Sequence, residues 1–178
     1  ALRTRLTGLS DAAREAGLAA ATLGRIDTAV IGDTHVAGLD ELRAAGVVDE
    51  RSGITWFSHP LLASTLLDLH TAEERSSAHL KLATALDDPD ERALHLGRGT
   101  ESASEPVALE LERAAGRLDA RGAPETAALL AKRAATLTPA DDTAARTRRL
   151  LMAADLYQVA GEGRDHVLPL LERLAGTL

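Results

Sequence analysis

The chain has no cysteine among its 178 residues. A disulfide framework, a thiolate metal site and a cysteine nucleophile are therefore excluded, and a reducing, cytoplasmic location is expected. No apolar run approaches the ~18 residues that would predict a membrane span, and the first residues lack the shape of a signal peptide. We therefore expect no membrane partner.

Aromatic residues are also scarce, because the chain contains only one tryptophan, one tyrosine and one phenylalanine. Hydrophobic residues nevertheless make up 45% of the chain, so alanine and leucine must fill its core. Close helix-on-helix packing is favoured over a sheet, which would use more valine, isoleucine and aromatic residues. The composition predicts a mainly α protein.

Basic residues are outnumbered in both halves of the chain, whose net charge is −7. Residues 1–70 hold 6 arginines against 9 acidic residues, and residues 71–178 hold 14 basic residues against 18 acidic ones. Nucleic-acid-binding domains usually carry a basic face, so direct DNA binding is disfavoured. The two lysines, Lys81 and Lys132, follow no phosphate-binding glycine loop, which excludes a P-loop.

The first part of the chain shows the order helix, helix, helix, hairpin. A helix is predicted over residues 10–23 with Ser10 as its N-cap, a short one after Asp27, and a third over residues 36–45. A hairpin signal centred on Arg51-Ser52 follows. An isolated hairpin is marginal in water, so we interpret this one as the wing of a winged-helix domain over residues 1–70.

The remainder, residues 71–178, is helical in pattern throughout. Helix starts are marked by a Thr71–Glu74 capping box, by Asp88-Pro89, by residues 122–124 and by Thr138-Pro139. The helices are short and closely connected, so successive helices should be antiparallel neighbours.

Two internal similarities support a repeat in this second part. Residues 129–137 match residues 170–178, and the run Leu111, Ala114, Ala115, Leu118 matches Leu150, Ala153, Ala154, Tyr157. Small residues at matching positions allow close helix approach, as in tetratricopeptide-type arrays. We predict a tetratricopeptide-like helical-repeat domain over residues 71–178.

No catalytic motif is present, so the chain is not expected to be an enzyme. The six histidines lack metal-ligand spacing, and the acids at 87–91 are interpreted as helix caps. Arg146, Arg148 and Arg149 form a basic patch that is solvated or paired with Asp141, Asp142 or Glu112. The exposed face of residues 39–43 carries two acids and one arginine, and phosphates would repel it, so this segment is not expected to act as a DNA-recognition helix. The histidines are His35, His59, His70, His79, His95 and His166.

Several segments together resemble the middle region of large ATP-binding LuxR-family transcriptional regulators, of the STAND class. The resemblance covers nearly the whole chain and rests on Gly24-Arg25-Ile26-Asp27, residues 42–48, Phe57-Ser58-His59-Pro60-Leu61-Leu62, residues 90–96, residues 121–130 and Leu137-Thr138-Pro139.

This resemblance implies a piece of a longer protein, with an ATPase module before it and a DNA-binding helix-turn-helix after it. No cofactor is expected in this chain, ATP or ADP binds elsewhere in the parent protein, and DNA is contacted only through the missing domain. The helical repeats would bind a small-molecule or protein inducer. The resemblance further implies that His59 senses nucleotide phosphates, although a histidine before a proline at a helix start is also a common junction residue. A stand-alone adaptor that binds a protein partner is the alternative function.

Overall fold

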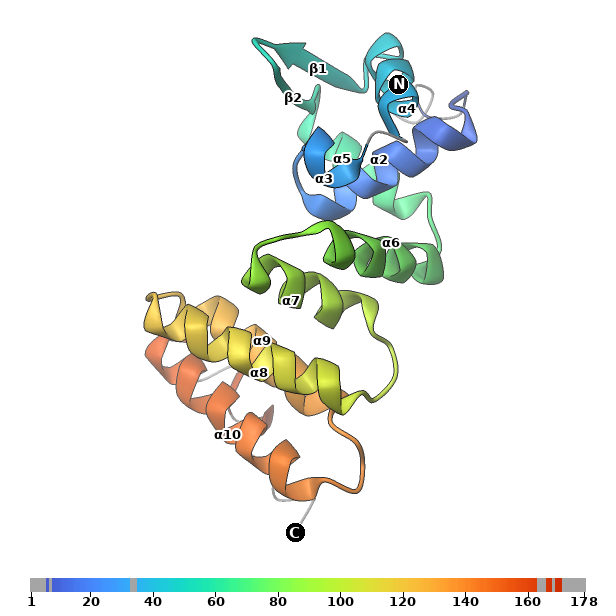
Figure 1. Cartoon of the computed structure of the whole chain (residues 1–178). Helices are drawn as coiled ribbons and strands as arrows, with labels where there is room; N and C mark the ends of the chain where they lie inside the picture. The colour runs from blue at the N-terminus through green and yellow to red at the C-terminus, as the bar shows by residue number, and fades with distance from the viewer. Residues whose placement is uncertain (1–5, 7, 33–34, 163–165, 168, 171–178) are drawn as a thin grey trace. The chain divides into compact units, whose positions relative to one another are not determined.

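The computed structural model describes residues 6, 8–32, 35–162, 166–167 and 169–170. The chain divides into two compact units, Ala1–Leu86 and Asp87–Leu178. The described residues form nine α-helices and one antiparallel hairpin (Figure 1), so the prediction of a mainly α protein is confirmed. The predicted domains, residues 1–70 and 71–178, are not tested by this division into compact units and stay a prediction.

The first unit follows the predicted order of elements closely. Its elements are α2 (Asp11–Leu23), α3 (Thr28–Ile31), α4 (Val36–Ala44), β1 (Val48–Arg51), β2 (Ile54–Phe57), α5 (Pro60–Asp68) and α6 (Ala72–Ala85). The side chains of Ser10, Asp27 and Thr71 cap α2, α3 and α6, and Glu74 completes the capping box. These helices begin where predicted because each start is fixed by a local side chain.

The hairpin turns at Ser52-Gly53, one residue later in the chain than the predicted Arg51-Ser52. Both turn residues have positive φ, 53° and 78°, as a two-residue type I′ turn requires. The register pairs Val48 with Phe57. This pair lies on the inner face of the hairpin, where Val48 is buried and Phe57 packs against the core.

Helix α2 is the centre of the first unit, because α4, α5 and α6 all pack against it. Close approach to α4 depends on Gly38, since a Cβ built there would lie 2.4 Å from the carbonyl oxygen of Ala12. Leu42, Leu62 and Leu66 are fully buried in the main core of this unit.

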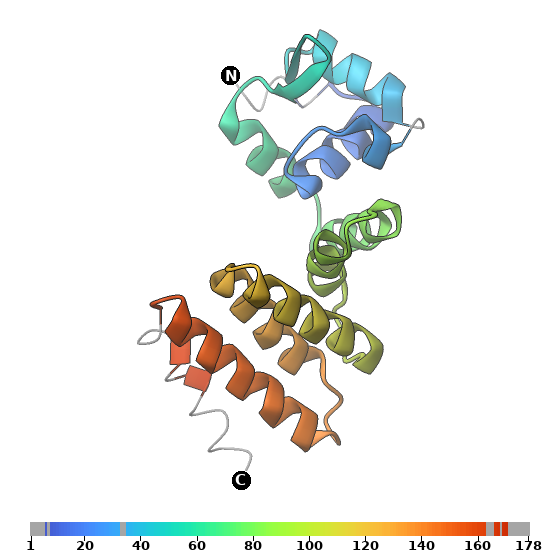
Figure 2. The ribbon, with the colours of Figure 1, turned by 60° about the vertical axis from the view of Figure 1, so that its left-hand side comes forward.

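The second unit consists of helices joined by short connections (Figure 2). Those whose bounds the structure describes are α7 (Pro89–Gly99), α8 (Glu105–Ala120), α9 (Pro124–Leu137) and α10 (Thr143–Val159). Helix α9 packs extensively against both α8 and α10, and its buried face is mostly alanine. Consecutive helices thus pack pairwise, as the small residues predicted.

The predicted internal repeat agrees with the burial of α8 and α10 where the structure describes it. Leu111, Ala114 and Ala115 of α8 are fully buried, and their counterparts Leu150, Ala153 and Ala154 of α10 are buried too. Residues 171–178, which carry most of the similarity to residues 129–137, lie outside the described residues.

One predicted helix start is wrong. Helix α10 begins at Thr143 with Asp142 as its N-cap, four residues after Pro139. Thr138 is instead the C-cap of α9, and its hydroxyl donates to the carbonyl of Ala134 (2.8 Å). Pro139 therefore follows a helix end, where its missing N–H costs nothing.

Candidate functional site at the hairpin–helix junction

His59 lies between the hairpin and α5, as the N-cap of that helix. Its Nδ1 accepts a hydrogen bond from the backbone N–H of Leu61 (3.1 Å), and Pro60 occupies the first helical position. Because Nδ1 is the acceptor, a neutral ring carries its proton on Nε2. The side chain is exposed, and Nε2 has no hydrogen-bond or ion-pair partner among the described residues. The ring can therefore cap α5 and donate outward to an anion at the same time.

Ser58 fixes the position of this junction. Its backbone N–H donates to the carbonyl of Val47 (3.0 Å), and its hydroxyl donates to the carbonyl of Gly46 (2.7 Å). The chain entering α5 is thus held against the segment that leaves α4. The capping interpretation of His59 agrees with this geometry, while its nucleotide-sensing role stays a prediction.

The outer face of the hairpin exposes two large apolar side chains. Ile54 and Trp56 are 67% and 41% exposed. In the register they lie opposite Arg51 and Asp49, which are also exposed. The chain's one tryptophan therefore points away from the core, whereas its neighbour Phe57 packs into it.

The charges on α4 are compensated within the first unit. Arg43 pairs with Asp40 (2.5 Å) and with Glu50. Glu41 accepts hydrogen bonds from the hydroxyl and the backbone N–H of Ser10 (2.5 and 2.8 Å), which lower the pKa of Glu41. The only cation of this helix is thus neutralised, which does not favour contact with phosphates.

The remaining histidines do not form a single cluster. His35 and His70 line one groove of the first unit, His95 is buried in α7, and His166 stacks on the ring of Tyr157 with centroids 4.5 Å apart. Among the described residues, no group of three or more His, Asp or Glu side chains could hold a metal ion.

Two of the acids at 87–91 have different roles. Asp88 caps α7 as predicted, accepting from the backbone N–H groups of Asp90 and Glu91 (2.8 and 2.9 Å). Asp90 is itself buried and accepts from Arg117 Nε (2.7 Å) and pairs with Arg121. Arg117 lies in the last turn of α8 and Arg121 is the C-cap of that helix, but nothing in the sequence linked them to Asp90.

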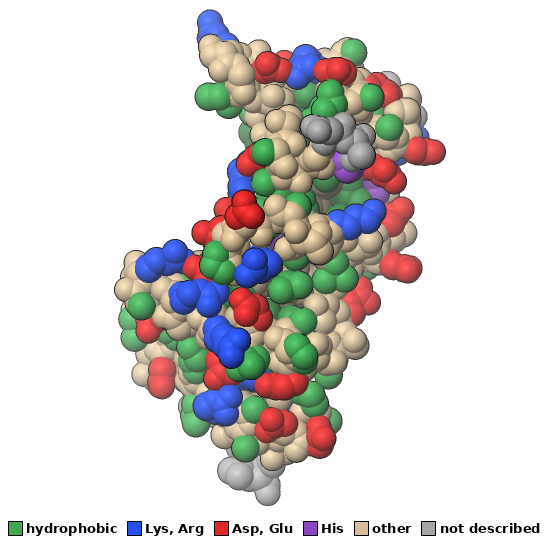
Figure 3. Space-filling model, viewed as in Figure 1, with side chains coloured by type: hydrophobic (Ala, Val, Ile, Leu, Met, Phe, Trp, Pro, Cys, Tyr) green, Lys and Arg blue, Asp and Glu red, His purple; other side chains and the backbone are tan. Residues whose placement is uncertain are grey.

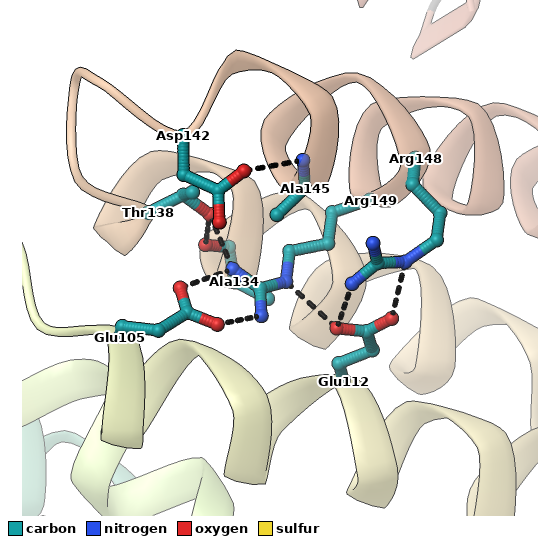
Figure 4. A network of polar contacts seen from close by, with 8 residues as sticks. All are labelled: Glu105, Glu112, Ala134, Thr138, Asp142, Ala145, Arg148 and Arg149. Carbon is teal, nitrogen blue, oxygen red and sulfur yellow. Dashed lines mark hydrogen bonds and ion pairs between the residues drawn. The ribbon is translucent and has the colours of Figure 1, made fainter.

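The predicted arginine patch proves to be a polar network in the second unit (Figure 4). Arg149 is fully buried and donates to both carboxylate oxygens of Glu105 (2.6 and 2.8 Å), to Glu112 (2.8 Å) and to the Thr138 hydroxyl (2.7 Å). Arg148 donates to both oxygens of Glu112 (3.0 and 3.1 Å). The predicted partner Glu112 is confirmed, and Glu105 was missed.

Hydrogen bonding in this network lowers the pKa values of its carboxyl groups and raises those of its arginines. The bonds from Arg149 lower the pKa of Glu105, and those from Arg148 and then Arg149 lower the pKa of Glu112. The same contacts, with Glu105 first, raise the pKa of Arg149. All these groups are therefore charged and mutually paired at neutral pH, which indicates that the patch is structural.

In the part of the chain that the structure describes, no helix is long and apolar enough to cross a membrane. Comparison with protein-family models, with curated proteins and with solved structures finds no match to this chain. The resemblance to the LuxR-family regulators therefore rests on the residues quoted above and stays a prediction.

Proposed function

We propose that this chain is the regulatory middle region of a LuxR-type transcriptional regulator of the STAND class. Its first unit would act as a winged-helix domain that holds or releases the ATPase module of the parent protein. Its second unit would belong to a tetratricopeptide-like array that binds the inducer or a protein partner. The chain itself would be regulatory rather than catalytic.

The position of His59 carries this proposal. The residue follows a three-helix and hairpin arrangement, it is exposed, and its capping bond uses Nδ1, which leaves Nε2–H without a partner among the described residues. A neutral imidazole N–H at a helix N-terminus is well suited to a phosphate oxygen, because both the donor and the helix dipole favour negative charge. Holding nucleotide in this way would couple its presence to the state of the regulator.

The pairing of Arg43 on α4 with nearby acids further supports a regulatory role for the first unit rather than direct DNA recognition. A recognition helix needs uncompensated donors facing the groove, whereas Arg43 is occupied by Asp40 and Glu50. DNA would be contacted only through a helix-turn-helix elsewhere in the parent protein.

Isothermal titration of the 178-residue chain with ADP and ATP tests the proposal. No measurable binding is expected, because residues that cradle phosphates in this class belong to the ATPase module. A longer chain that includes the preceding module should bind both nucleotides. Tight binding to the 178-residue chain alone would overturn the assignment.

A further inference from the structure

A groove of about 650 Å³ opens within the first unit between α2 and α6. Its volume lies within the roughly 300–1,000 Å³ typical of small-ligand sites. Residues 11–19 of α2 and residues along the whole length of α6 line it, and α3 and the α5–α6 connection complete its walls. In the space-filling view, histidine, acidic and basic side chains lie near one another on one face of the first unit (Figure 3).

The floor of the groove is apolar. Leu18 of α2, Ile31 of α3 and Leu82 of α6 line it and are each less than a tenth exposed. Val30 and Ala78 extend the same apolar surface. A ligand covering this floor would be favoured by the removal of apolar surface from water.

The rim is charged, with an excess of acids. Four carboxylates line the groove against two basic side chains, which leaves two uncompensated negative charges when the histidines are counted as neutral. These residues are Asp11, Glu15, Glu73 and Glu74 against Arg14 and Lys81.

Within the rim, Glu15 and Glu73 are the acids left without a partner. Asp11 pairs with Arg14 (3.6 Å), and Glu74 accepts the Thr71 N–H of the capping box (2.7 Å). Glu15 and Glu73 have no hydrogen bond or ion pair to any residue that the structure describes. Lys81 lies eight residues beyond Glu73 on α6, which places it about 12 Å further along the helix axis.

We propose that this groove binds a small organic cation. Its ammonium group would be attracted by Glu15 and Glu73, and its apolar body would cover Leu18, Ile31 and Leu82. An anion would be repelled by the excess of carboxylates on the rim. Apart from Arg14, which is paired with Asp11, Lys81 is the one Lys or Arg of the lining that could attract it. The proposal does not depend on the regulatory role of His59.

Three probes separate the features of this ligand in an NMR titration of the ¹⁵N-labelled 178-residue chain at pH 7.5. 4-Phenylbutylamine carries both the cation and an apolar body, n-butylamine lacks the aromatic part, and 4-phenylbutyrate reverses the charge. We expect saturable shifts of α2 and α6 amides with 4-phenylbutylamine, and at least fivefold weaker binding of the other two. Equal binding of 4-phenylbutyrate, or shifts scattered over both units, would overturn the proposal.

Single-charge variants then test the residues themselves. Glu15→Gln and Glu73→Gln should each weaken 4-phenylbutylamine about threefold or more, whereas Lys81→Gln should leave its affinity unchanged or raise it. Asp49→Asn is the matched control, because it removes one negative charge from the exposed face of the hairpin, outside the groove. All four sites are exposed, and each free variant is first checked for a native amide spectrum. If both glutamate variants bind as tightly as Asp49→Asn, the site is not the one proposed.

Discussion

Replacing Arg149 by alanine should strongly destabilise the second unit. The guanidinium is fully buried and makes hydrogen bonds to Glu105, Glu112 and Thr138. Removing one partner of a buried ion pair costs about 3–5 kcal/mol, because the opposite charge stays behind without compensation. Glu105 is 40% exposed and Glu112 19%, so these carboxylates would recover part of their hydration. We therefore expect the lower end of the range, about 3 kcal/mol.

Arg148→Ala is the matched control. Arg148 lies next to Arg149 on α10 and donates to the same carboxylate, that of Glu112, but its side chain is 58% exposed. An exposed pair of this kind contributes less than about 1 kcal/mol. Both variants remove one arginine and a contact to Glu112 from the same helix, so the difference between them reports what the burial of Arg149 and its bonds to Glu105 and Thr138 add.

Hydrogen exchange followed by mass spectrometry reads the stability of α8, α9 and α10 separately from that of the first unit. A loss of about 3 kcal/mol corresponds to exchange roughly a hundredfold faster in these helices. For a unit of this size it also lowers the melting temperature by about 12 °C or more. Equal and small effects of Arg149→Ala and Arg148→Ala would refute the view that the buried network holds these helices together.

Three further predictions concern stability. Pairing lowers the pKa of Glu105 and Glu112 below 4.5, so their contribution to the free energy of unfolding is complete above that pH and is lost as the pH falls through the lowered values. Urea unfolding midpoints measured between pH 3 and 6 should show this loss. In Arg149→Ala the midpoint should depend less on pH. Gly38→Ala should cost about 1–3 kcal/mol in urea unfolding, because its Cβ would meet the Ala12 carbonyl at 2.4 Å. The same substitution at Gly116, where nothing lies within 4 Å, should instead stabilise the chain by up to about 1 kcal/mol; a loss there would contradict the packing explanation.

The starts of several helices could be predicted because the signals are local. Ser10, Asp27, Thr71 and Asp88 each satisfy free N–H groups within three residues of themselves, so their effect is visible in the sequence. The helix start predicted at Pro139 is wrong because a proline is an ambiguous local signal. A proline marks either the first turn of a helix or the residues after its end, and only the Asp142 cap shows which applies.

The features that depend on long-range packing could not be predicted in this way. Arg149 meets Glu105 across 44 residues of sequence, and the groove requires α2 and α6 to lie together, some sixty residues apart. No spacing rule connects such residues. For His59, the following proline predicted a helix junction, but a partner for Nε2 outside the local sequence is not encoded in it.

The release of nucleotide from a longer chain that includes the proposed ATPase module tests the proposed role of His59 most directly. Serine is a good N-cap, so His59→Ser should keep α5 intact while removing the outward Nε2–H, whereas His59→Ala removes both. The expected result is that both variants release ADP at least about tenfold faster than the wild type, as the loss of a charge-assisted hydrogen bond would cause. If His59→Ser releases ADP at the wild-type rate, His59 only caps a helix and the proposed nucleotide coupling is wrong.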